Sequence, residues 1–214
     1  MSAYDAIAAL YDPWSRSVTE DVDFYVAQAR KAGGPVVELG IGTGRIAVPI
    51  AKAGARVIGI DDSESMLALC RRRAEEAGVS DLVELRLGDL RRPPVLERVR
   101  LVTCPFRALL HLGSDGERLE ALRAVYLLLE PGGRFVFDMK NVVTHAFRYL
   151  GATPDRRRRN FPPRAELRSL LGEAGFVNAE TRPGLLPGIG LVDVPNIPLF
   201  KAFAHTVFFV ARRP

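Results

Sequence analysis

Cysteine, lysine and long apolar runs are all scarce in this chain of 214 residues, and each scarcity excludes a class of protein. The two cysteines, Cys70 and Cys104, lie far apart and match neither a metal-site spacing nor a redox motif. No apolar run reaches the length of about 18 residues or more that a membrane-spanning helix needs. Residues 1–5 lack the basic and apolar regions of a secretory signal. We therefore expect a cytoplasmic protein with no metal site and no membrane association.

Lysine is so rare that arginine supplies nearly all of the basic side chains behind the formal net charge of +5. The lysines are Lys31, Lys52, Lys140 and Lys201. This skew is typical of a GC-rich bacterial genome as much as of a phosphate-binding face. Side chains 71–73, all arginine, fall in a predicted helix and spread around its axis instead of forming a stripe. The arginines at 156–159 could contact an anion, but a solvated loop is the simpler interpretation.

Apolar patterning predicts helices that alternate with strands along most of the chain. The predicted strands are 35–39, 55–60, 82–87, 99–104, 133–138, 176–181 and 205–211. The predicted helices are 3–11, 18–32, 43–53, 63–77, 115–129 and 163–174. Such alternation indicates an α/β fold, a mostly parallel Rossmann-like sheet with helices on both faces. The length is about that of one domain, and no repeat or boundary divides residues 1–214.

A glycine-rich turn follows the first predicted strand, where residues 38–44 read Glu-Leu-Gly-Ile-Gly-Thr-Gly. A strand, a glycine turn and a helix start together form an arrangement in which a nucleotide-like cofactor meets bare backbone amides. A dinucleotide-binding turn has the pattern G-x-G-x-x-G. Here the glycines are Gly40, Gly42 and Gly44, and Arg45 occupies the place of the third dinucleotide glycine. The turn therefore departs from the dinucleotide pattern.

Two acids flank this turn in a way that favours S-adenosylmethionine over NAD. Asp61 ends the second predicted strand, 19 residues after Gly42, and is placed to bind the two hydroxyls of a ribose. Glu38 stands where a pyrophosphate would be repelled. The ammonium group of S-adenosylmethionine, in contrast, attracts a carboxylate directly or through water.

These residues resemble motif I of the class I S-adenosylmethionine-dependent methyltransferases, and the resemblance extends over roughly residues 4–138. It continues at Gly-Ile-Asp-Asp-Ser 59–63, Met-Leu 66–67, Gly-Asp-Leu 88–90 and Pro-Gly-Gly 131–133. The resemblance implies seven strands, the last one antiparallel, and S-adenosylmethionine as the cofactor. The cofactor-binding residues that we predict are Tyr11, Glu38, Gly40, Gly42, Gly44, Asp61, Asp62, Met66, Asp89, Leu90 and Cys104. Among them, Glu38, the glycines and Tyr11 would hold the methionine part, Asp61 the ribose, and Asp89 with Leu90 the adenine.

The segment after the fourth strand, residues 103–111, reads Thr-Cys-Pro-Phe-Arg-Ala-Leu-Leu-His. Methyltransferases that modify adenine or amide nitrogen carry Asn/Asp-Pro-Pro-Tyr/Phe here, and ubiquinone/menaquinone C-methyltransferases carry an acidic stretch. The segment instead resembles that of small-molecule N-, O- or C-methyltransferases. His111 is the candidate general base, because histidine titrates near neutrality, although a histidine here often only braces the pocket. Arg107 is the candidate for orienting an acidic acceptor, with a solvated or salt-bridged role as the alternative.

The predicted protein is thus a single methyltransferase domain that acts on a small molecule, with no nucleic-acid partner. Residues 1–34 would form a helical lid, and 139–162 and 183–204 would form acceptor-side or interface segments. The second of these is rich in apolar residues, so a homodimer is possible. The alternatives are a nucleic-acid methyltransferase, which the pI near 9.5 keeps open, an NAD(P)-dependent oxidoreductase, or a non-catalytic S-adenosylmethionine-binding protein.

Overall fold

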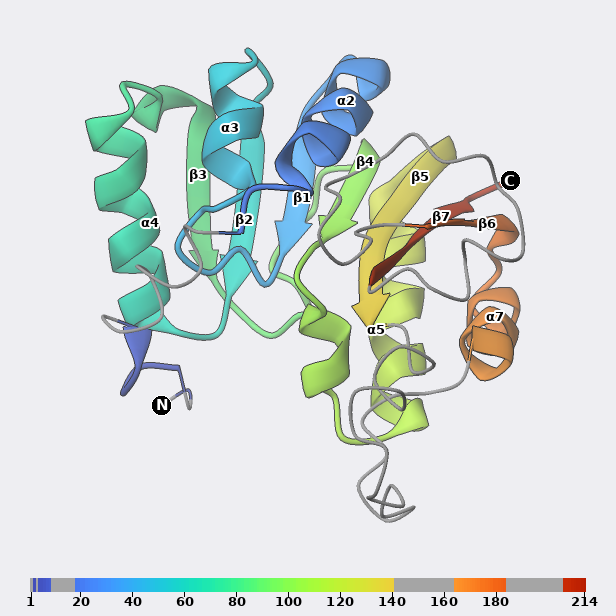
Figure 1. Ribbon diagram of the computed structural model, residues 1–214. Coiled ribbons are helices and arrows are strands. Elements are labelled where there is room, and N and C mark those ends of the chain that lie inside the picture. The colour runs from blue at the N-terminus through green and yellow to red at the C-terminus, as the bar shows by residue number, and fades with distance from the viewer. Residues whose placement is uncertain (1, 3, 9–17, 141–163, 184–205) are drawn as a thin grey trace.

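The computed structural model describes residues 2, 4–8, 18–140, 164–183 and 206–214, which Figure 1 draws as ribbon. Seven strands form one sheet in the order β3-β2-β1-β4-β5-β7-β6. The strands are β1 (Val36–Leu39), β2 (Val57–Asp61), β3 (Val83–Leu87), β4 (Val99–Cys104), β5 (Leu129–Lys140), β6 (Val177–Pro183) and β7 (Thr206–Arg212). Strands β1 to β5 pair in parallel, and β7 is antiparallel to both β5 and β6. The predicted Rossmann-like sheet with an antiparallel last strand is confirmed.

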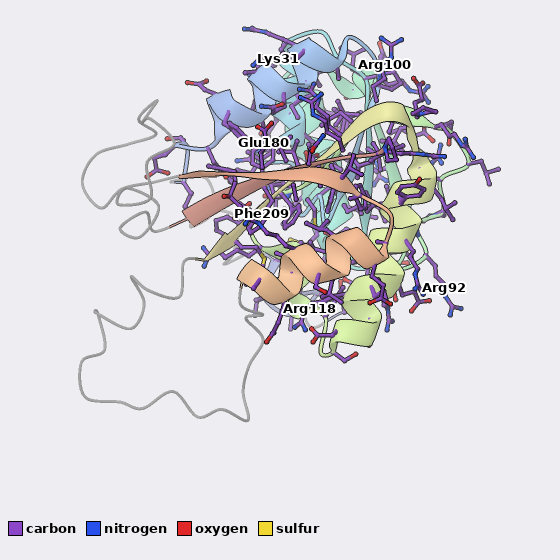
Figure 2. The ribbon with its side chains drawn as sticks, turned by 90° about the vertical axis from the view of Figure 1, so that its right-hand side faces the viewer. Lys31, Arg92, Arg100, Arg118, Glu180 and Phe209 are labelled. Atoms are coloured by element: carbon purple, nitrogen blue, oxygen red, sulfur yellow. The ribbon has the colours of Figure 1, made fainter. Side chains whose placement is uncertain are left out.

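Helices cover both faces of this sheet, as predicted. The helices α2 (Val22–Ala32), α3 (Ala47–Lys52) and α4 (Glu64–Glu76) pack on one face, and α5 (Asp115–Leu128) and α7 (Arg164–Glu173) pack on the other. Successive side chains of a strand point to opposite faces of the sheet. Val36 therefore packs in the core under α2, α3 and α4, and Val37 packs in the core under α5 and α7. Figure 2 shows α5 and α7 side by side, with Phe209 of β7 close to α7.

Several predicted boundaries change for identifiable reasons. The helix predicted over 43–53 begins only at Ala47. The N–H groups of Val48 and Ile50 bond to carbonyls four residues earlier, but Pro49 between them has no N–H, so the series of helical hydrogen bonds is interrupted there. Strand β5 begins at Leu129 instead of 133, since Leu129 pairs with Val99 before the register shifts. The helix predicted over 18–32 begins at Val22.

The N-terminal segment also differs from its prediction where the structure describes it. Residues 4–7 form turns, with the Ile7 N–H bonded to the Tyr4 carbonyl, and only Ala8 is helical. The rest of the predicted helix 3–11 lies outside the described residues, as do 141–162 and 184–204 of the two predicted acceptor-side segments. Within the part of the chain that the structure describes, no helix is long and apolar enough to cross a membrane.

The carboxyl ends of the parallel strands meet at one edge of the sheet, toward the bottom of Figure 1. There the chain turns from β1 toward α3, from β2 into α4, and from β4 into the short 3-10 helix η2 (Ala108–His111). Ser63 caps α4 by accepting a hydrogen bond from the Met66 N–H, so the helix begins directly after β2. In open α/β sheets this edge is where ligands bind.

Candidate active site

A cavity of about 400 Å³ opens at this edge and collects most of the predicted cofactor-binding residues. Its volume lies within the range of small-molecule sites, about 300–1,000 Å³. Its walls come from the N-terminal segment and from the loops after β1, β2, β3 and β4. The predicted residues that line it are Gly40, Gly42, Asp61, Asp62, Met66, Asp89, Leu90 and His111. We call this cavity the cleft.

The three glycines of the turn after β1 have different surroundings. Gly40 and Gly42 adopt positive φ angles of 67° and 55° and line the cleft. A Cβ at Gly40 would lie 2.7 Å from the Cβ of Ala108, whereas no atom lies within 4 Å of such a position at Gly42. A ligand can therefore approach the backbone at Gly42. Gly44 does not line the cleft, because its Cα packs on α4, where an added Cβ would lie 2.6 Å from the Cys70 Sγ.

Asp61 connects the glycine turn to the start of α4. Its Oδ2 accepts a hydrogen bond from the Gly42 N–H at 2.8 Å, and its Oδ1 accepts one from the Ser63 N–H at 3.0 Å. Burial raises the pKa of Asp61, and these two backbone donors oppose the shift. Each carboxylate oxygen has a second lone pair, so Asp61 can still accept from ligand hydroxyls. Asp62, the next residue, accepts from the Ser2 hydroxyl at 2.8 Å.

Glu38 occupies a small cavity of about 30 Å³ beside the glycine turn, which Pro105 and Phe106 also line. The Glu38 side chain is almost fully buried. Its Oε2 lies 3.5 Å from the Thr103 hydroxyl, and among the described residues its Oε1 has no hydrogen-bond partner of ordinary geometry, the Ala47 N–H acting on the carboxyl only as a weaker donor. Burial raises the pKa of Glu38 to about 8, against the lowering effect of Arg45. A buried carboxyl with an unpartnered oxygen fits a ligand that brings a cationic amine.

Beside the loop after β3, the cleft lining combines an ion pair with apolar side chains. Asp89 pairs with Arg91, and Arg91 also contacts the Glu117 carboxylate at 2.7 Å. The hydrogen bond from Arg91 holds the pKa of Asp89 below its ordinary value. Met66 is buried and Leu90 partly buried beside this pair, so an apolar slot with an acceptor at its rim results. This combination suits a flat aromatic base with an amino group.

His111 is paired with Tyr4 at the rim of the cleft. The Tyr4 hydroxyl lies 3.0 Å from His111 Nε2, with the two rings nearly perpendicular. Burial lowers the pKa of His111, Asp62 opposes this, and Arg107 adds to it. The ring is therefore neutral at pH 7 and able to accept a proton. The N-terminal segment is held further by Asp5, which accepts from the Ser63 hydroxyl at 2.6 Å.

Besides Glu38 and Gly44, three predicted residues lie apart from the cleft lining or beyond the described chain. Cys104 is fully buried in β4, and burial raises the pKa of its thiol. Arg107 has its guanidinium 5.2 Å from the centre of the Phe106 ring. Tyr11 lies outside the described residues. The roles assigned to these side chains from the sequence remain predictions.

The sequence analysis assigned no role to Tyr4, Arg91 or Asp138. Asp138 is buried in β5 and accepts hydrogen bonds from the Tyr25 hydroxyl at 2.9 Å and from the Phe106 N–H at 2.5 Å. The sequence contains one signal for it, an acid directly after the apolar run 135–137 at a strand end. For Tyr4 the signal is its place at the head of a Tyr-Asp-x-Ile-Ala segment. Arg91 had no signal beyond its nearness to Asp89.

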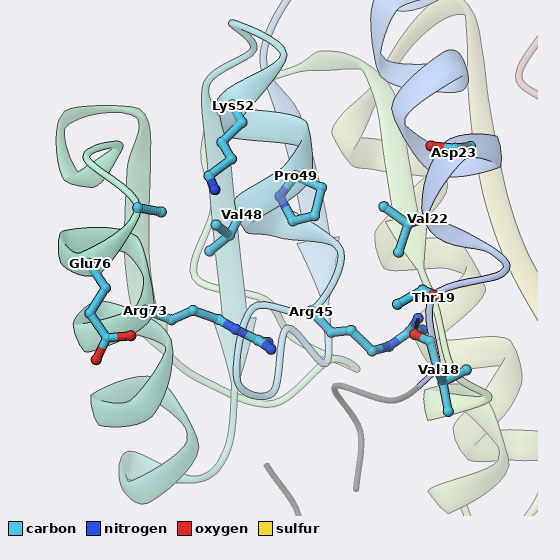
Figure 3. A pocket seen from close by; sticks show the side chains of 11 residues that line it. Val18, Thr19, Val22, Asp23, Arg45, Val48, Pro49, Lys52, Arg73 and Glu76 are labelled. Atoms are coloured by element: carbon cyan, nitrogen blue, oxygen red, sulfur yellow. Dashed lines mark hydrogen bonds between the residues drawn. The ribbon is translucent and has the colours of Figure 1, made fainter. Parts of the chain in front are cut away.

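A second cavity, of about 570 Å³, lies between α2, α3 and α4 and is drawn in Figure 3. Arg45, Lys52 and Arg73 are among its lining residues, and Figure 3 shows the Arg45 side chain extending toward Val18 and Thr19. Arg45 is ion-paired with Asp21. None of the residues predicted to bind the cofactor or to act in catalysis lines this cavity in the described chain. It is larger than the cleft but lies away from the strand ends.

Comparison with known proteins finds methyltransferases. Residues 36–133 match a family model described as a methyltransferase domain. A probable S-adenosylmethionine-dependent methyltransferase of Mycolicibacterium smegmatis is 31% identical over 166 residues, 77% of this chain and 60% of the relative. The ubiquinone biosynthesis O-methyltransferase of Pseudomonas fluorescens is 29% identical over 123 residues, 56% of this chain and 51% of the relative. The chain thus spans about half to three fifths of the length of these curated relatives.

The fold also has solved counterparts. The CcbJ methyltransferase from Streptomyces caelestis superposes with a TM-score of 0.74 at 23% identity, covering 91% of this chain and 96% of that one. At this identity the likeness concerns the fold. The family model and the curated relatives are methyltransferases, so the chain is similar in sequence to S-adenosylmethionine-dependent methyltransferases and shares the fold of one of them.

Proposed function

We propose that this protein transfers a methyl group from S-adenosylmethionine to a nitrogen, oxygen or carbon atom of a small molecule. The observation that carries the proposal is the unpartnered Oε1 of Glu38, buried beside the glycine turn at the carboxyl edge of the sheet. A buried acceptor without a donor is costly, and a cationic amine from a ligand satisfies it. The ammonium group of S-adenosylmethionine has this chemistry, and a pyrophosphate does not.

The remaining residues of the cleft fit the other parts of the same cofactor. Asp61 keeps free lone pairs for the ribose hydroxyls, and the open space at Gly42 admits the ligand against the backbone. Met66 and Leu90 would pack on the adenine, and Asp89 would accept from its amino group. The carboxyl groups would therefore accept hydrogen bonds along the cofactor, from its methionine end at Glu38 to its adenine end at Asp89.

The chemistry that the cofactor supplies is an electrophilic methyl group on a sulfonium, which leaves by in-line displacement as a neutral thioether. The protein has to align the acceptor and to exclude water. Neutral His111, hydrogen-bonded to Tyr4 at the rim of the cleft, would take a proton from an acceptor that has one to lose. Arg107, on the turn between β4 and His111, would orient an acidic acceptor.

A small-molecule acceptor is supported by the segment after β4 and by the distribution of charge. The segment has Cys104 and a single proline where nitrogen-modifying nucleic-acid enzymes carry Asn/Asp-Pro-Pro-Tyr/Phe. Among the described residues, Figure 2 shows Arg92 on a different side of the molecule from Lys31 and Arg100. The relative from Pseudomonas fluorescens acts, by its name, in ubiquinone biosynthesis. A homodimer through residues 183–204 remains a proposal.

Thermal-shift and calorimetric titrations with S-adenosylhomocysteine, S-adenosylmethionine and NADH test the cofactor assignment. We expect the first two ligands to bind at micromolar levels and to stabilise the fold, with no effect of NADH. Stabilisation by NADH alone would overturn the proposal. For the acceptor, labelled S-adenosylmethionine is incubated with a small-molecule extract, with RNA and with DNA. Salt-sensitive binding of a nucleic acid with label incorporated into it would favour the nucleic-acid alternative.

A further inference from the structure

The turn after β4 has an unusual backbone, because two consecutive residues that are not glycine adopt left-handed conformations. Phe106 has a φ of 56° and Arg107 a φ of 65°. Side chains with a Cβ rarely occupy this region, and such strain persists only where surrounding contacts hold it. The turn also lies at the active site, since Pro105, Phe106 and Ala108 line the cleft. The contacts that hold this turn therefore bear on the shape of the cleft.

The direct backbone anchor of the turn is Asp138 of β5. Its Oδ1 accepts the Phe106 N–H at 2.5 Å and the Tyr25 hydroxyl at 2.9 Å. Asp138 and Tyr25 are almost completely buried, and Asp138 points to the face of the sheet that α2 covers. Water cannot replace these bonds at low cost in such surroundings. The carboxylate thus joins α2, β5 and the strained turn.

We propose that Asp138 is a positioning residue that holds Phe106, and with it the turn after β4, in the geometry on which cofactor binding depends. The inference rests on the proposed function, because it assumes that the cleft binds the cofactor. Asp138 itself lies outside the cleft lining.

Two contacts link the turn after β4 to the residues proposed to bind the cofactor. Ala108 lies so close to Gly40 that a Cβ there would be 2.7 Å from the Ala108 Cβ. The Phe106 ring lies under the guanidinium of Arg45, 4.8 Å from the ring centre, and lines the small cavity of Glu38. A shift of the turn would therefore change both the glycine turn and the surroundings of Glu38.

The charged and titratable groups around Asp138 are Asp21, Tyr25, Arg45, Cys104 and Arg107. Tyr25 and the Phe106 backbone act on Asp138 through hydrogen bonds, whereas Asp21 and Arg107 act through charge alone. Arg45 is engaged with Asp21 in an ion pair. The contacts of the anchor are therefore the two hydrogen bonds that Asp138 accepts from Tyr25 and Phe106.

The experiment compares S-adenosylhomocysteine affinity, measured by titration calorimetry, for wild type, Asp138→Ala, Asp138→Asn and Tyr25→Phe. Asp138→Ala removes the acceptor of the Phe106 N–H, and we expect about a tenfold loss of affinity. Asp138→Asn keeps an oxygen at the same place and should recover most of this loss. Tyr25→Phe leaves the Phe106 bond in place and should stay within about threefold of wild type.

The matched control is Thr181→Ala, which alters a residue on β6 that is only 3% exposed, like Asp138. It should lower the melting temperature without changing S-adenosylhomocysteine affinity. In the Asp138→Ala background, Arg107→Gly should restore part of the affinity, because glycine tolerates a positive φ without the anchor. A purely structural role for Asp138 would show no such rescue.

Hydrogen exchange at the Phe106 amide gives a readout that does not depend on any ligand. We expect slow exchange in wild type and faster exchange in Asp138→Ala. If wild type fails to bind S-adenosylhomocysteine, the proposed function fails, and the exchange data still decide whether Asp138 anchors the turn. If wild type binds and Asp138→Ala binds equally well, or if Phe106 exchange is unchanged, the inference is overturned. If Asp138→Ala does not fold, Asp138→Ser replaces it, because the shorter serine side chain does not reach the Phe106 N–H. Faster Phe106 exchange and weaker binding in Asp138→Ser then support the anchor, and unchanged values overturn it.

Discussion

The backbone N–H of Gly42 donates a hydrogen bond to Oδ2 of Asp61 at 2.8 Å, and this bond ties the turn after β1 to the end of β2. The other carboxylate oxygen accepts from the Ser63 N–H. Asp61 thus shapes the cleft in addition to offering its remaining lone pairs to a ligand. If Asp61 binds the ribose as proposed, its bond to the glycine turn pre-organises it, so little side-chain entropy is lost on binding.

Asp61→Ala should weaken S-adenosylhomocysteine binding by about 1.5–3 kcal/mol, the range for hydrogen bonds to a charged group. The fold should persist, because Asp61 lies at a strand end and the core of β2 is untouched. Calorimetry gives the affinity and circular dichroism the fold. The affinity of Asp61→Asn, which keeps one acceptor oxygen, should lie between those of wild type and Asp61→Ala. Asp81 is an exposed acid in the 3-10 helix η1 (Ser80–Leu82), and Asp81→Ala should have no effect on affinity. Unchanged affinity in folded Asp61→Ala protein would refute ribose recognition by this residue.

Those parts of the site that depend on local sequence could be predicted, since the glycine turn, Asp61 and Asp89 each follow a strand whose apolar pattern is visible. Contacts between distant segments could not. Tyr25 and Asp138 are 113 residues apart, and Tyr4 and His111 are 107 apart. Only packing of α2 on β5 and of the N-terminal segment on η2 brings them together, and no single-chain pattern encodes either register.

The same distinction explains the turn after β4 and the position of Gly44. Arg107 and Cys104 were chosen for their place after a strand, but the direction of a side chain there depends on the left-handed backbone of Phe106. Gly44 resembles its two neighbours in sequence, yet its Cα faces Cys70 on α4. Spacing identified the turn, whereas the role of each glycine depends on tertiary contacts.

Binding of S-adenosylhomocysteine should release a proton, and its affinity should rise between pH 6 and pH 8. Burial raises the pKa of Glu38 to about 8, so the carboxyl is protonated at neutral pH before a ligand binds. A ligand ammonium favours the carboxylate, so binding displaces the proton. The affinity gain should approach about tenfold per pH unit below the pKa of about 8 and then level off. Calorimetry in buffers with different ionisation enthalpies measures the proton count directly.

Glu38→Gln supplies the control for this linkage, because it keeps the shape and removes the titration. The variant should bind more weakly and without proton release. The unliganded protein gives a second check with the opposite sign. Since its folded pKa of about 8 exceeds the ordinary 4.5, the stabilising contribution of neutral Glu38 is complete below pH 4.5 and is lost as the pH rises toward 8. Proton uptake on binding, or none in wild type, would contradict the assignment of Glu38 to the ammonium.

Gly44→Ala and Gly42→Ala should separate stability from binding. At Gly44, with a φ of 79°, a Cβ would meet the Cys70 Sγ at 2.6 Å, so steric overlap of about 1–3 kcal/mol adds to a left-handed penalty of about 1–2 kcal/mol. At Gly42 only the second penalty applies, but the new methyl group faces the cleft. We expect denaturant unfolding to show the larger loss for Gly44→Ala and calorimetry the larger loss for Gly42→Ala.

Two further variants test the cause of each effect. Cys70→Ala in the Gly44→Ala background removes the overlapping sulfur and should recover part of the stability. Gly34→Ala, where φ is ordinary and no atom lies within 4 Å of the added Cβ, should be close to neutral. Equal unfolding free energies for Gly44→Ala and wild type would show that α4 yields to the methyl group at no cost.

His111 should titrate below the ordinary histidine pKa of 6.5, because burial disfavours its charged form. The chain has three histidines, so NMR of the ring protons with His111→Gln as the assignment control resolves its titration. Arg107→Ala should raise the pKa, since Arg107 lowers it, and Asp62→Asn should lower it further, since Asp62 raises it. If neutral His111 accepts the proton of the acceptor, the acid limb of the methyl-transfer rate follows the same order among these variants. A titration at or above 6.5, or a rate limb that does not move with it, would leave His111 with only the bracing role that its contact with Tyr4 provides.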